Sequence, residues 1–129
     1  MKKFSDEVMK KNFNTFEFLF LKQKSNQINM PKIYEYFGLI FFFYSNEHLP
    51  IHVHVSKADS EMKFDLVYEG GKLSRIDIKK ISGKEILSKK DINDAVELIK
   101  TYHEDICKKW TDFFVMGKQI SVEKISKKI

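Results

Sequence analysis

Apolar and polar residues alternate along two neighbouring segments in the middle of the chain. The segment from Ile51 to Ser56 has an apolar residue at every second position, and the same alternation runs from Glu61 to Tyr68. Successive side chains of a strand point to opposite faces, so each segment is predicted to bury one face and to leave the other polar. The polar residues 57–60 between them predict a turn, which makes the whole an antiparallel hairpin.

The alternation also predicts the register of this hairpin. A four-residue turn over residues 57–60 pairs each apolar residue of one strand with an apolar residue of the other. On the polar face the same register sets His52 opposite Asp65. His54 then lies opposite Lys63. A slip by one residue would bring buried side chains against exposed ones, and this disfavours other registers.

A second hairpin is predicted before the first. Residues Ile33–Phe37 and Leu39–Tyr44 read as two strands around Gly38. The second of these strands is apolar on both faces, so we expect it in the centre of the sheet with both faces covered. The long helix described below or the N-terminal segment is expected to supply the second cover.

The turn after the central hairpin contains a Gly-Gly pair. We expect a three-residue loop with Gly71 in the left-handed conformation, because this loop places Ile76 opposite Phe64. The same loop places Ile78 opposite Met62. A two-residue Gly-Gly turn would move both isoleucines to the histidine face.

A helical pattern follows. Ser88 precedes Asp91 by three residues, a spacing typical of a helix N-terminus, and Gly117 is placed to end the helix. The apolar residues between them recur at helical spacing and are Ile92, Ala95, Val96, Ile99, Tyr102, Ile106, Trp110 and Phe113. Beyond the helix, Ile120 and Val122 predict a short closing strand.

These elements predict an α+β fold, in which a mainly antiparallel sheet of hairpins packs against one long C-terminal helix, with a short closing strand. A chain of 129 residues has room for one core, so we expect a single domain over residues 30–129. Residues 1–29 mix Lys and Asn with a Phe-rich stretch, and they are predicted to form an N-terminal extension.

Composition narrows the class of protein. Hydrophobic residues make up 43% of the chain, which excludes a disordered protein. The longest apolar run, Phe37–Tyr44, is too short to cross a bilayer, and we expect no membrane partner. Cys107 is the single cysteine and cannot form an internal disulfide. A reducing compartment is therefore favoured, and we expect the protein in the cytoplasm.

The net charge of +5 invites a nucleic-acid interpretation, so its distribution matters. Residues 1–29 carry six Lys against three acids, and residues 84–129 carry ten Lys against eight acids. Residues 30–83 carry seven basic and seven acidic groups. The excess therefore lies at the two ends of the sequence. This distribution permits contact with RNA but does not by itself predict a phosphate-binding surface.

Three of the four histidines, His48, His52 and His54, fall within seven residues. On a strand the last two project from the same face, about 6.5–7 Å apart. That face is polar in the pattern, so both rings are expected to point away from the packed interior. Imidazole both gives and takes protons near neutral pH, which makes the face a candidate for proton transfer or phosphate contact.

Three neighbouring residues complete this candidate site. Asp65 lies opposite His52 and is expected to fix its tautomer. Glu47 and Tyr44 lie in the Tyr-Ser-Asn-Glu-His segment, at the mouth of the loop that precedes the strand. The alternative that remains open is that histidines on a half-exposed strand are ordinary surface residues.

A metal site is the rival chemical interpretation. His48, His52 and His54 together supply three ligands, the number that a catalytic zinc takes from protein. The sequence has neither a helical His-Glu-x-x-His motif nor paired cysteines, and we expect a site without metal or other cofactor. Elsewhere, His103 is expected to pack at the edge of the core, and Cys107 to be an inert thiol.

Several of these residues also carry a family resemblance. Met30-Pro31-x-Ile33-Tyr34, the stretch Phe41–His48 and Pro50-x-His52-Val53-His54-Val55 are similar to the bacterial family known as domain of unknown function 4160. The similarity covers roughly residues 30–116. Members usually end in a helix that carries a Trp, and Trp110 lies in the corresponding predicted helix here. Residues 1–29 are additional, and Ile51 stands where members often have a proline.

The resemblance implies a small bacterial stress or defence protein, because members often neighbour a second small family in arrangements typical of toxin–antitoxin modules. The leading hypothesis is a toxin–antitoxin-type protein whose histidine face contacts RNA, with His52 or His54 as general base or acid. Glu47 and Asp65 would orient them. The alternative is a binding module without enzymatic activity, or an antitoxin, that pairs with a cognate small protein through strand edges and the aromatic N-terminal segment. The oligomeric state is left open.

Overall fold

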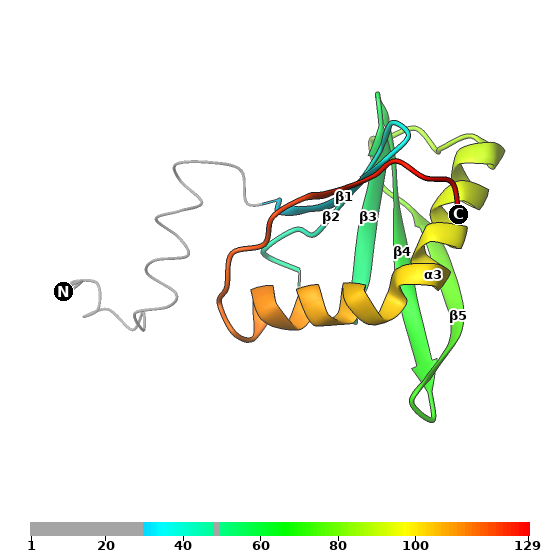
Figure 1. Ribbon diagram of the computed structural model, residues 1–129. Coiled ribbons are helices and arrows are strands. Elements are labelled where there is room, and N and C mark those ends of the chain that lie inside the picture. Colours follow the sequence, from blue (N-terminus) through cyan, green and yellow to red (C-terminus); the bar gives the residue numbers. More distant parts are fainter. Residues whose placement is uncertain (1–29, 48–49) are drawn as a thin grey trace.

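A computed structural model describes residues 30–47 and 50–129 of the chain. It contains β1 (Lys32–Tyr36), β2 (Leu39–Phe42), β3 (His52–Lys57), β4 (Ser60–Glu69), β5 (Lys72–Lys80), α3 (Lys89–Phe114) and β6 (Glu123–Ile125). The strands form one six-stranded sheet in the order β5-β4-β3-β2-β1-β6, and α3 lies across one of its faces (Figure 1). All neighbouring pairs are antiparallel except β1 and β6, which are parallel. The predicted α+β fold is confirmed.

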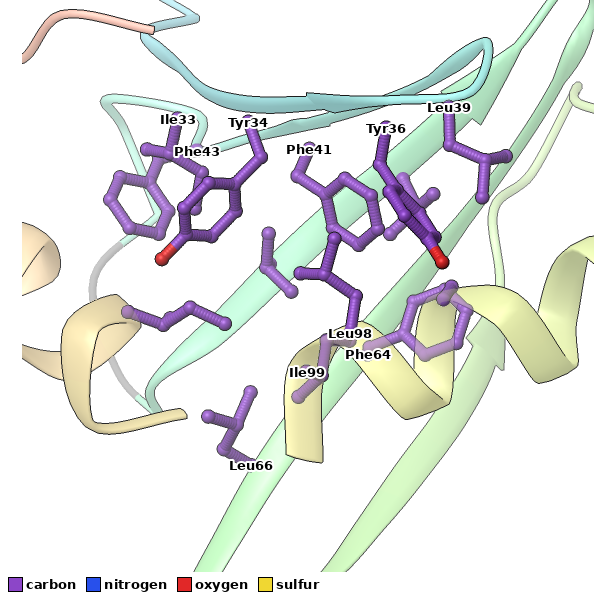
Figure 2. Packing of buried hydrophobic residues seen from close by; sticks show 14 of the residues in the cluster. Ile33, Tyr34, Tyr36, Leu39, Phe41, Phe43, Phe64, Leu66, Leu98 and Ile99 are labelled. Atoms are coloured by element: carbon purple, nitrogen blue, oxygen red, sulfur yellow. The ribbon is translucent and has the colours of Figure 1, made fainter. Parts of the chain in front are cut away.

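The apolar core lies between this face of the sheet and α3. Aromatic side chains of β1 and β2 point from the sheet towards the helix, where Leu98 and Ile99 meet them (Figure 2). The buried helical residues are Ala95, Leu98, Ile99, Ile106 and Trp110. The helical spacing of apolar residues in the sequence is therefore a consequence of packing against a sheet.

The register of the β3–β4 hairpin is the predicted one. His52 pairs with Asp65 and His54 pairs with Lys63. The turn is shorter than expected, because Lys57 and Ser60 still belong to the strands and two residues connect them. The shorter turn leaves the register unchanged, so the faces of the two strands are as predicted.

The predicted register of β4 and β5 is wrong by two residues. Phe64 pairs with Ile78, not with Ile76, and the turn is the two-residue Gly-Gly turn. Gly70 and Gly71 have φ angles of 61° and 80°, which suits a tight hairpin. An irregularity in pairing between Val67 and the next residue shifts the strand back, so that both isoleucines stay on the core face.

Strand β2 lies between β1 and β3, as its apolar sequence predicts. Its residue Phe41 is fully buried on the helix side. On the other side Phe42 is covered by the rings of His54 and Tyr44, at centroid distances of 5.5 and 5.3 Å. Helix α3 is therefore not the cover of the second face. The N-terminal segment, the other expected cover, lies outside the described residues.

Helix α3 begins as predicted, since the backbone N–H of Asp91 donates to Ser88 Oγ at 3.1 Å. It bends at Tyr102, whose φ and ψ of −109° and 16° are not helical. The adjacent Thr101 donates its hydroxyl to the carbonyl of Glu97 at 2.9 Å, a contact that bends helices. The change of direction is visible in the middle of the helix (Figure 1).

The chain turns back after the helix at Gly117, which has a φ of 68°, and ends in β6. This closing strand is Glu123–Ile125, slightly later than the predicted Ile120 and Val122. Ile125 joins the core, whereas Val122 is exposed. In the part of the chain that the structure describes, no helix combines the length and the apolar character needed to cross a membrane.

Candidate functional site

His52 and His54 lie on the face of the sheet that faces away from α3, as the alternation predicts. Their expected exposure is wrong, because only 3% and 1% of their surfaces are accessible. The His54 ring lies against Tyr44 and Glu61, and the His52 ring lies against His54 and Glu47, so both are buried without being part of the apolar core. We call Glu47, His52 and His54, which meet at one point, the histidine–carboxylate cluster.

His54 contacts a carboxylate with each ring nitrogen. Its Nδ1 lies 3.1 Å from Glu61 Oε2, and its Nε2 lies 2.9 Å from Glu47 Oε1. Tyr44 packs edge-on against the ring at 4.4 Å, and Phe42 stacks on it at 5.5 Å. Burial lowers the pKa of His54, although the hydrogen bond with Glu47 acts in the opposite direction. The neutral ring is therefore favoured.

His52 is held by the backbone on one side. Its Nδ1 lies 2.6 Å from the carbonyl oxygen of Pro50, and its Nε2 lies 3.1 Å from Glu47 Oε1. A carbonyl oxygen only accepts hydrogen bonds, so the Nδ1 of His52 carries a proton and donates it. The Pro50 carbonyl therefore fixes the tautomer.

The predicted role of Asp65 as the group that fixes this tautomer is wrong. Asp65 stands opposite His52 in the ladder, but its carboxylate pairs with Lys79 at 2.9 Å and with Lys63 at 3.9 Å. The lysine of the neighbouring strand β5 competes for the carboxylate, which sequence register cannot reveal. One oxygen of this buried group, Oδ1, has no hydrogen-bond partner among the described residues.

Glu47 is the exposed member of the cluster, with 44% of its side chain accessible. It follows a turn in which its backbone N–H donates to the carbonyl of Tyr44 at 3.1 Å. Its partial burial alone would raise the pKa of the carboxyl. The hydrogen bonds with His54 and His52 outweigh this effect, and the pKa lies below its usual value. Glu47 is therefore ionised at neutral pH, and it is the member of the cluster most open to solvent.

Glu61 belongs to the same site, although no site role was predicted for it. It is 4% exposed, and its Oε2 accepts from the Tyr44 hydroxyl at 3.1 Å and faces His54 Nδ1. Burial, followed by the charge of Glu61, raises the pKa of Tyr44 to about 12. The sequence signal was present, since Glu61 alternates onto the histidine face. Glu61 lies diagonal to His54 in the ladder, whereas Asp65 is the direct cross-strand neighbour of His52.

Three ligand atoms converge in the cluster. One from each of Glu47, His52 and His54 lie within 4.8 Å of one another, so these residues could hold a metal ion once their side chains move closer together. The predicted third histidine, His48, lies outside the described residues. Within residues 30–47 and 50–129, the structure thus joins Glu47 to both strand histidines and Tyr44 to His54, and it separates Asp65 from them.

A cavity of about 360 Å³ adjoins the cluster on the same face. It is lined by Met30, Lys32, Ile40, Phe42, Tyr44, Ser56, Ala58, Ser60, Glu61 and Lys84. Tyr44 and Glu61 belong to both the cavity and the surroundings of His54. The two lysines place positive charge beside the buried carboxylate, and Lys84 Nζ lies 3.7 Å from Glu61 Oε1.

The fourth histidine lies on the opposite side of the sheet. His103 Nδ1 is 2.7 Å from the hydroxyl of Tyr68, which is also 3.1 Å from Cys107 Sγ. Burial raises the pKa of Tyr68, followed by the effect of Cys107. Both helical residues are only partly buried, which agrees with the predicted place of His103 at the edge of the core.

Comparison with protein families matches residues 38–111 to a domain of unknown function, DUF4160. This range is more than half of the 129 residues. The chain belongs to this family. The DUF4160 match contains the whole β2–β3–β4 core of the site, including Glu47, His52, His54 and Glu61. Neither the curated proteins nor the solved structures contain a match to this chain.

Proposed function

We propose that this DUF4160 protein is a toxin–antitoxin-type enzyme that cleaves RNA, with the histidine–carboxylate cluster as its catalytic centre. The observation that carries the proposal is the meeting of two buried imidazoles and one half-exposed carboxylate at a single oxygen, Glu47 Oε1. A cytoplasmic site of action belongs to the proposal, since RNA is found there and the single Cys107 suits a reducing compartment.

The contacts of His52 support the uptake of a proton by this cluster. A neutral imidazole carries one N–H, and that of His52 is engaged by the Pro50 carbonyl. Its Nε2 therefore presents a lone pair to Glu47 Oε1 across 3.1 Å. In this neutral state no proton lies between the two acceptors, and the hydrogen bond that lowers the pKa of Glu47 forms only when a proton enters. A proton taken up from a substrate completes that hydrogen bond, so the cluster is suited to general-base catalysis.

The accessible surface assigns the roles. Glu47 is the member that contacts the substrate, and it accepts the proton of a ribose 2′-hydroxyl as the 2′-oxygen attacks the neighbouring phosphorus. The bond to the 5′-oxygen breaks, and the proton returns to that oxygen from the cluster. His52 and His54 act as positioning residues, because they are buried and hold Glu47 in place. Lys32 and Lys84 in the adjoining cavity supply positive charge for phosphate groups.

Expression in a bacterium tests this function. The wild-type chain is expected to slow growth and to fragment cellular RNA. The His52→Ala, His54→Ala double variant and the Glu47→Gln variant are expected to do neither. His103→Ala is the matched control, because it removes a histidine outside the cluster and should stay toxic. Equal growth and intact RNA in all four cultures would reject a toxic nuclease.

Glu47→Gln guards this test against loss of folding. It changes a half-exposed side chain and leaves both imidazoles in place, so its thermal melting curve should match that of the wild type. Activity retained in this folded variant would contradict the role given to Glu47.

A second candidate function is that of a non-enzymatic partner of a cognate small protein. Strand β5 forms one edge of the sheet, and its Ile78 is 41% exposed. An uncovered strand edge can pair with a strand of another chain. Under this function, Ile78→Lys would abolish co-purification with the neighbouring gene product, whereas Glu47→Gln would not. A chain that captures no partner would count against it.

A further inference from the structure

We propose that Glu47, His52 and His54 bind one divalent transition-metal cation of the zinc class. The proposal rests on the proposed function and deepens it: with a cation bound to Oε1, the other carboxylate oxygen of Glu47 is the one that accepts the hydroxyl proton. Cation binding itself follows from the contacts alone and requires no RNA. The site consists of the four ring nitrogens of His52 and His54, the central oxygen Glu47 Oε1, and two acceptors on the outer side of the rings, the Pro50 carbonyl and Glu61 Oε2.

The first argument is a shortage of protons. All four ring nitrogens of the two histidines face acceptors, namely the Pro50 carbonyl, Glu61 Oε2 and, twice, Glu47 Oε1. Two neutral rings have two N–H groups for these four contacts. Placing both on the outer nitrogens satisfies Pro50 and Glu61. Both Nε2 lone pairs then point at a carboxylate oxygen, an arrangement that a cation between the three atoms makes favourable.

The second argument is the distance between these atoms. Nε2 of His54 and Nε2 of His52 lie 2.9 and 3.1 Å from Glu47 Oε1, and all three ligand atoms lie within 4.8 Å. Ligands at about 2.0–2.1 Å from a tetrahedral zinc are themselves about 3.3–3.4 Å apart. The Nε2 atoms and Glu47 Oε1 spread over up to 4.8 Å, so the two Nε2 atoms must move closer together by about an ångström or more before they share one cation. Binding therefore requires a rotation of the imidazole rings together with a small shift of Glu47, the exposed member.

The third argument concerns the partners of the two Nδ1 atoms. Metal-binding histidines usually donate their second ring N–H to a carbonyl or a carboxylate, which fixes the tautomer and turns the free lone pair towards the metal. His52 has such an anchor in the Pro50 carbonyl at 2.6 Å, and His54 has one in Glu61 at 3.1 Å. The Tyr44 hydroxyl in turn positions Glu61. Both Nε2 atoms are thus prepared as ligands.

The ligand set also selects the cation. Two imidazoles with one carboxylate suit zinc and neighbouring transition metals, whereas magnesium and calcium prefer oxygen ligands throughout. Three ligands from residues 30–47 and 50–129 leave one tetrahedral position for a further ligand, water or a substrate, as in catalytic zinc sites. That position falls on the Glu47 side, because both histidines are buried.

Metal titration of the purified full-length chain tests the proposal. After treatment with a chelator and its removal, the wild type is expected to take up about one zinc per chain in calorimetry and elemental analysis, and not to bind magnesium. His52→Ala and His54→Ala should each weaken zinc binding at least tenfold. Glu47→Gln should also weaken zinc binding at least tenfold. Because the Glu47 side chain is half-exposed, this variant is expected to fold, so the test stays decisive if a histidine variant does not.

Two further variants separate this site from others. Glu61→Gln keeps all three ligands and removes the negative charge beside His54 Nδ1. Glu61 is a positioning residue, so this variant should weaken zinc binding about 10–100-fold. His103→Ala should leave zinc binding unchanged. Zinc uptake lost in His103→Ala but kept in Glu47→Gln would place the cation near Tyr68 and Cys107 and overturn the proposal, as would a wild-type chain that binds no zinc.

The RNA assay distinguishes the two proposals. RNA cleavage by a chain that takes up no zinc would refute the cation site and leave the proposed function in place. One zinc per chain, lost in the cluster variants, together with intact RNA would refute the proposed function and leave the cation site.

Discussion

Replacing Glu61 by alanine tests the polar network that holds His54. The carboxylate is 4% exposed and accepts from two groups, the Tyr44 hydroxyl and His54 Nδ1, both at 3.1 Å. Glu61→Ala leaves both donors without an acceptor. A buried donor that loses its partner costs about 1–3 kcal/mol, so two suggest about 2–6 kcal/mol. Water from the adjoining cavity can replace part of this, and we expect a loss of about 2–4 kcal/mol.

Chemical denaturation of the purified chain measures this loss, with Glu61→Gln and Glu69→Ala as matched variants. The glutamine keeps a carbonyl oxygen for the two donors and should cost about 1 kcal/mol. Glu69 is the control, because its side chain is 68% exposed and its removal should barely move the midpoint.

A double-mutant cycle isolates the hydrogen bond from Tyr44. Tyr44→Phe should cost about 1 kcal/mol in the wild-type chain and close to nothing in the Glu61→Ala chain, where its acceptor is already absent. If Glu61→Ala unfolds at the same denaturant concentration as Glu69→Ala, the carboxylate is not the acceptor. The assignment of the Nδ1 proton of His54 would then be refuted.

Three further predictions concern the frame that carries the site. Gly38→Ala should lower stability by about 1–2 kcal/mol in denaturation, because the φ of 87° at this position is left-handed. The nearest side-chain atom lies 3.6 Å from the new Cβ, so the cost comes from the backbone and not from a clash. An unchanged midpoint would contradict this conformation. Ser88→Ala should cost about 1 kcal/mol through loss of the helix cap, whereas Ser88→Asp should cost little, and equal losses would argue against capping. Leu98→Ala should cost about 2–5 kcal/mol because Leu98 is fully buried, and thermal melting would show a loss this large; a surface-like effect would mean that α3 does not cover the sheet.

Alternation in the sequence was sufficient to predict the faces and the register of β3 and β4. The same reasoning misplaced β5 by two residues, because the irregularity after Val67 leaves no pattern in the sequence. The two-residue Gly-Gly turn alone would place Ile76 and Ile78 on the histidine face, and the irregularity in pairing returns them to the core face. Turn chemistry alone therefore could not supply the pairing of Phe64 with Ile78.

The candidate site could be predicted in part for a related reason. Strand periodicity places His52 and His54 on one face, but it does not say whether neighbouring side chains enclose them. Their burial depends on Phe42 and Tyr44 from another strand and on Glu61, whose contacts are tertiary. The anchor of His52 is a backbone carbonyl, which any residue type can supply, so the sequence offered no signal for it.

Anomalous X-ray scattering at the zinc edge, from crystals of the full-length chain grown with zinc, tests the central claim most directly. We expect one peak on the polar face, about 2.0–2.1 Å from the Nε2 atoms of His52 and His54 and within bonding distance of a Glu47 oxygen. Crystals with no peak at these atoms, or with the peak beside His103 and Cys107, would contradict the account.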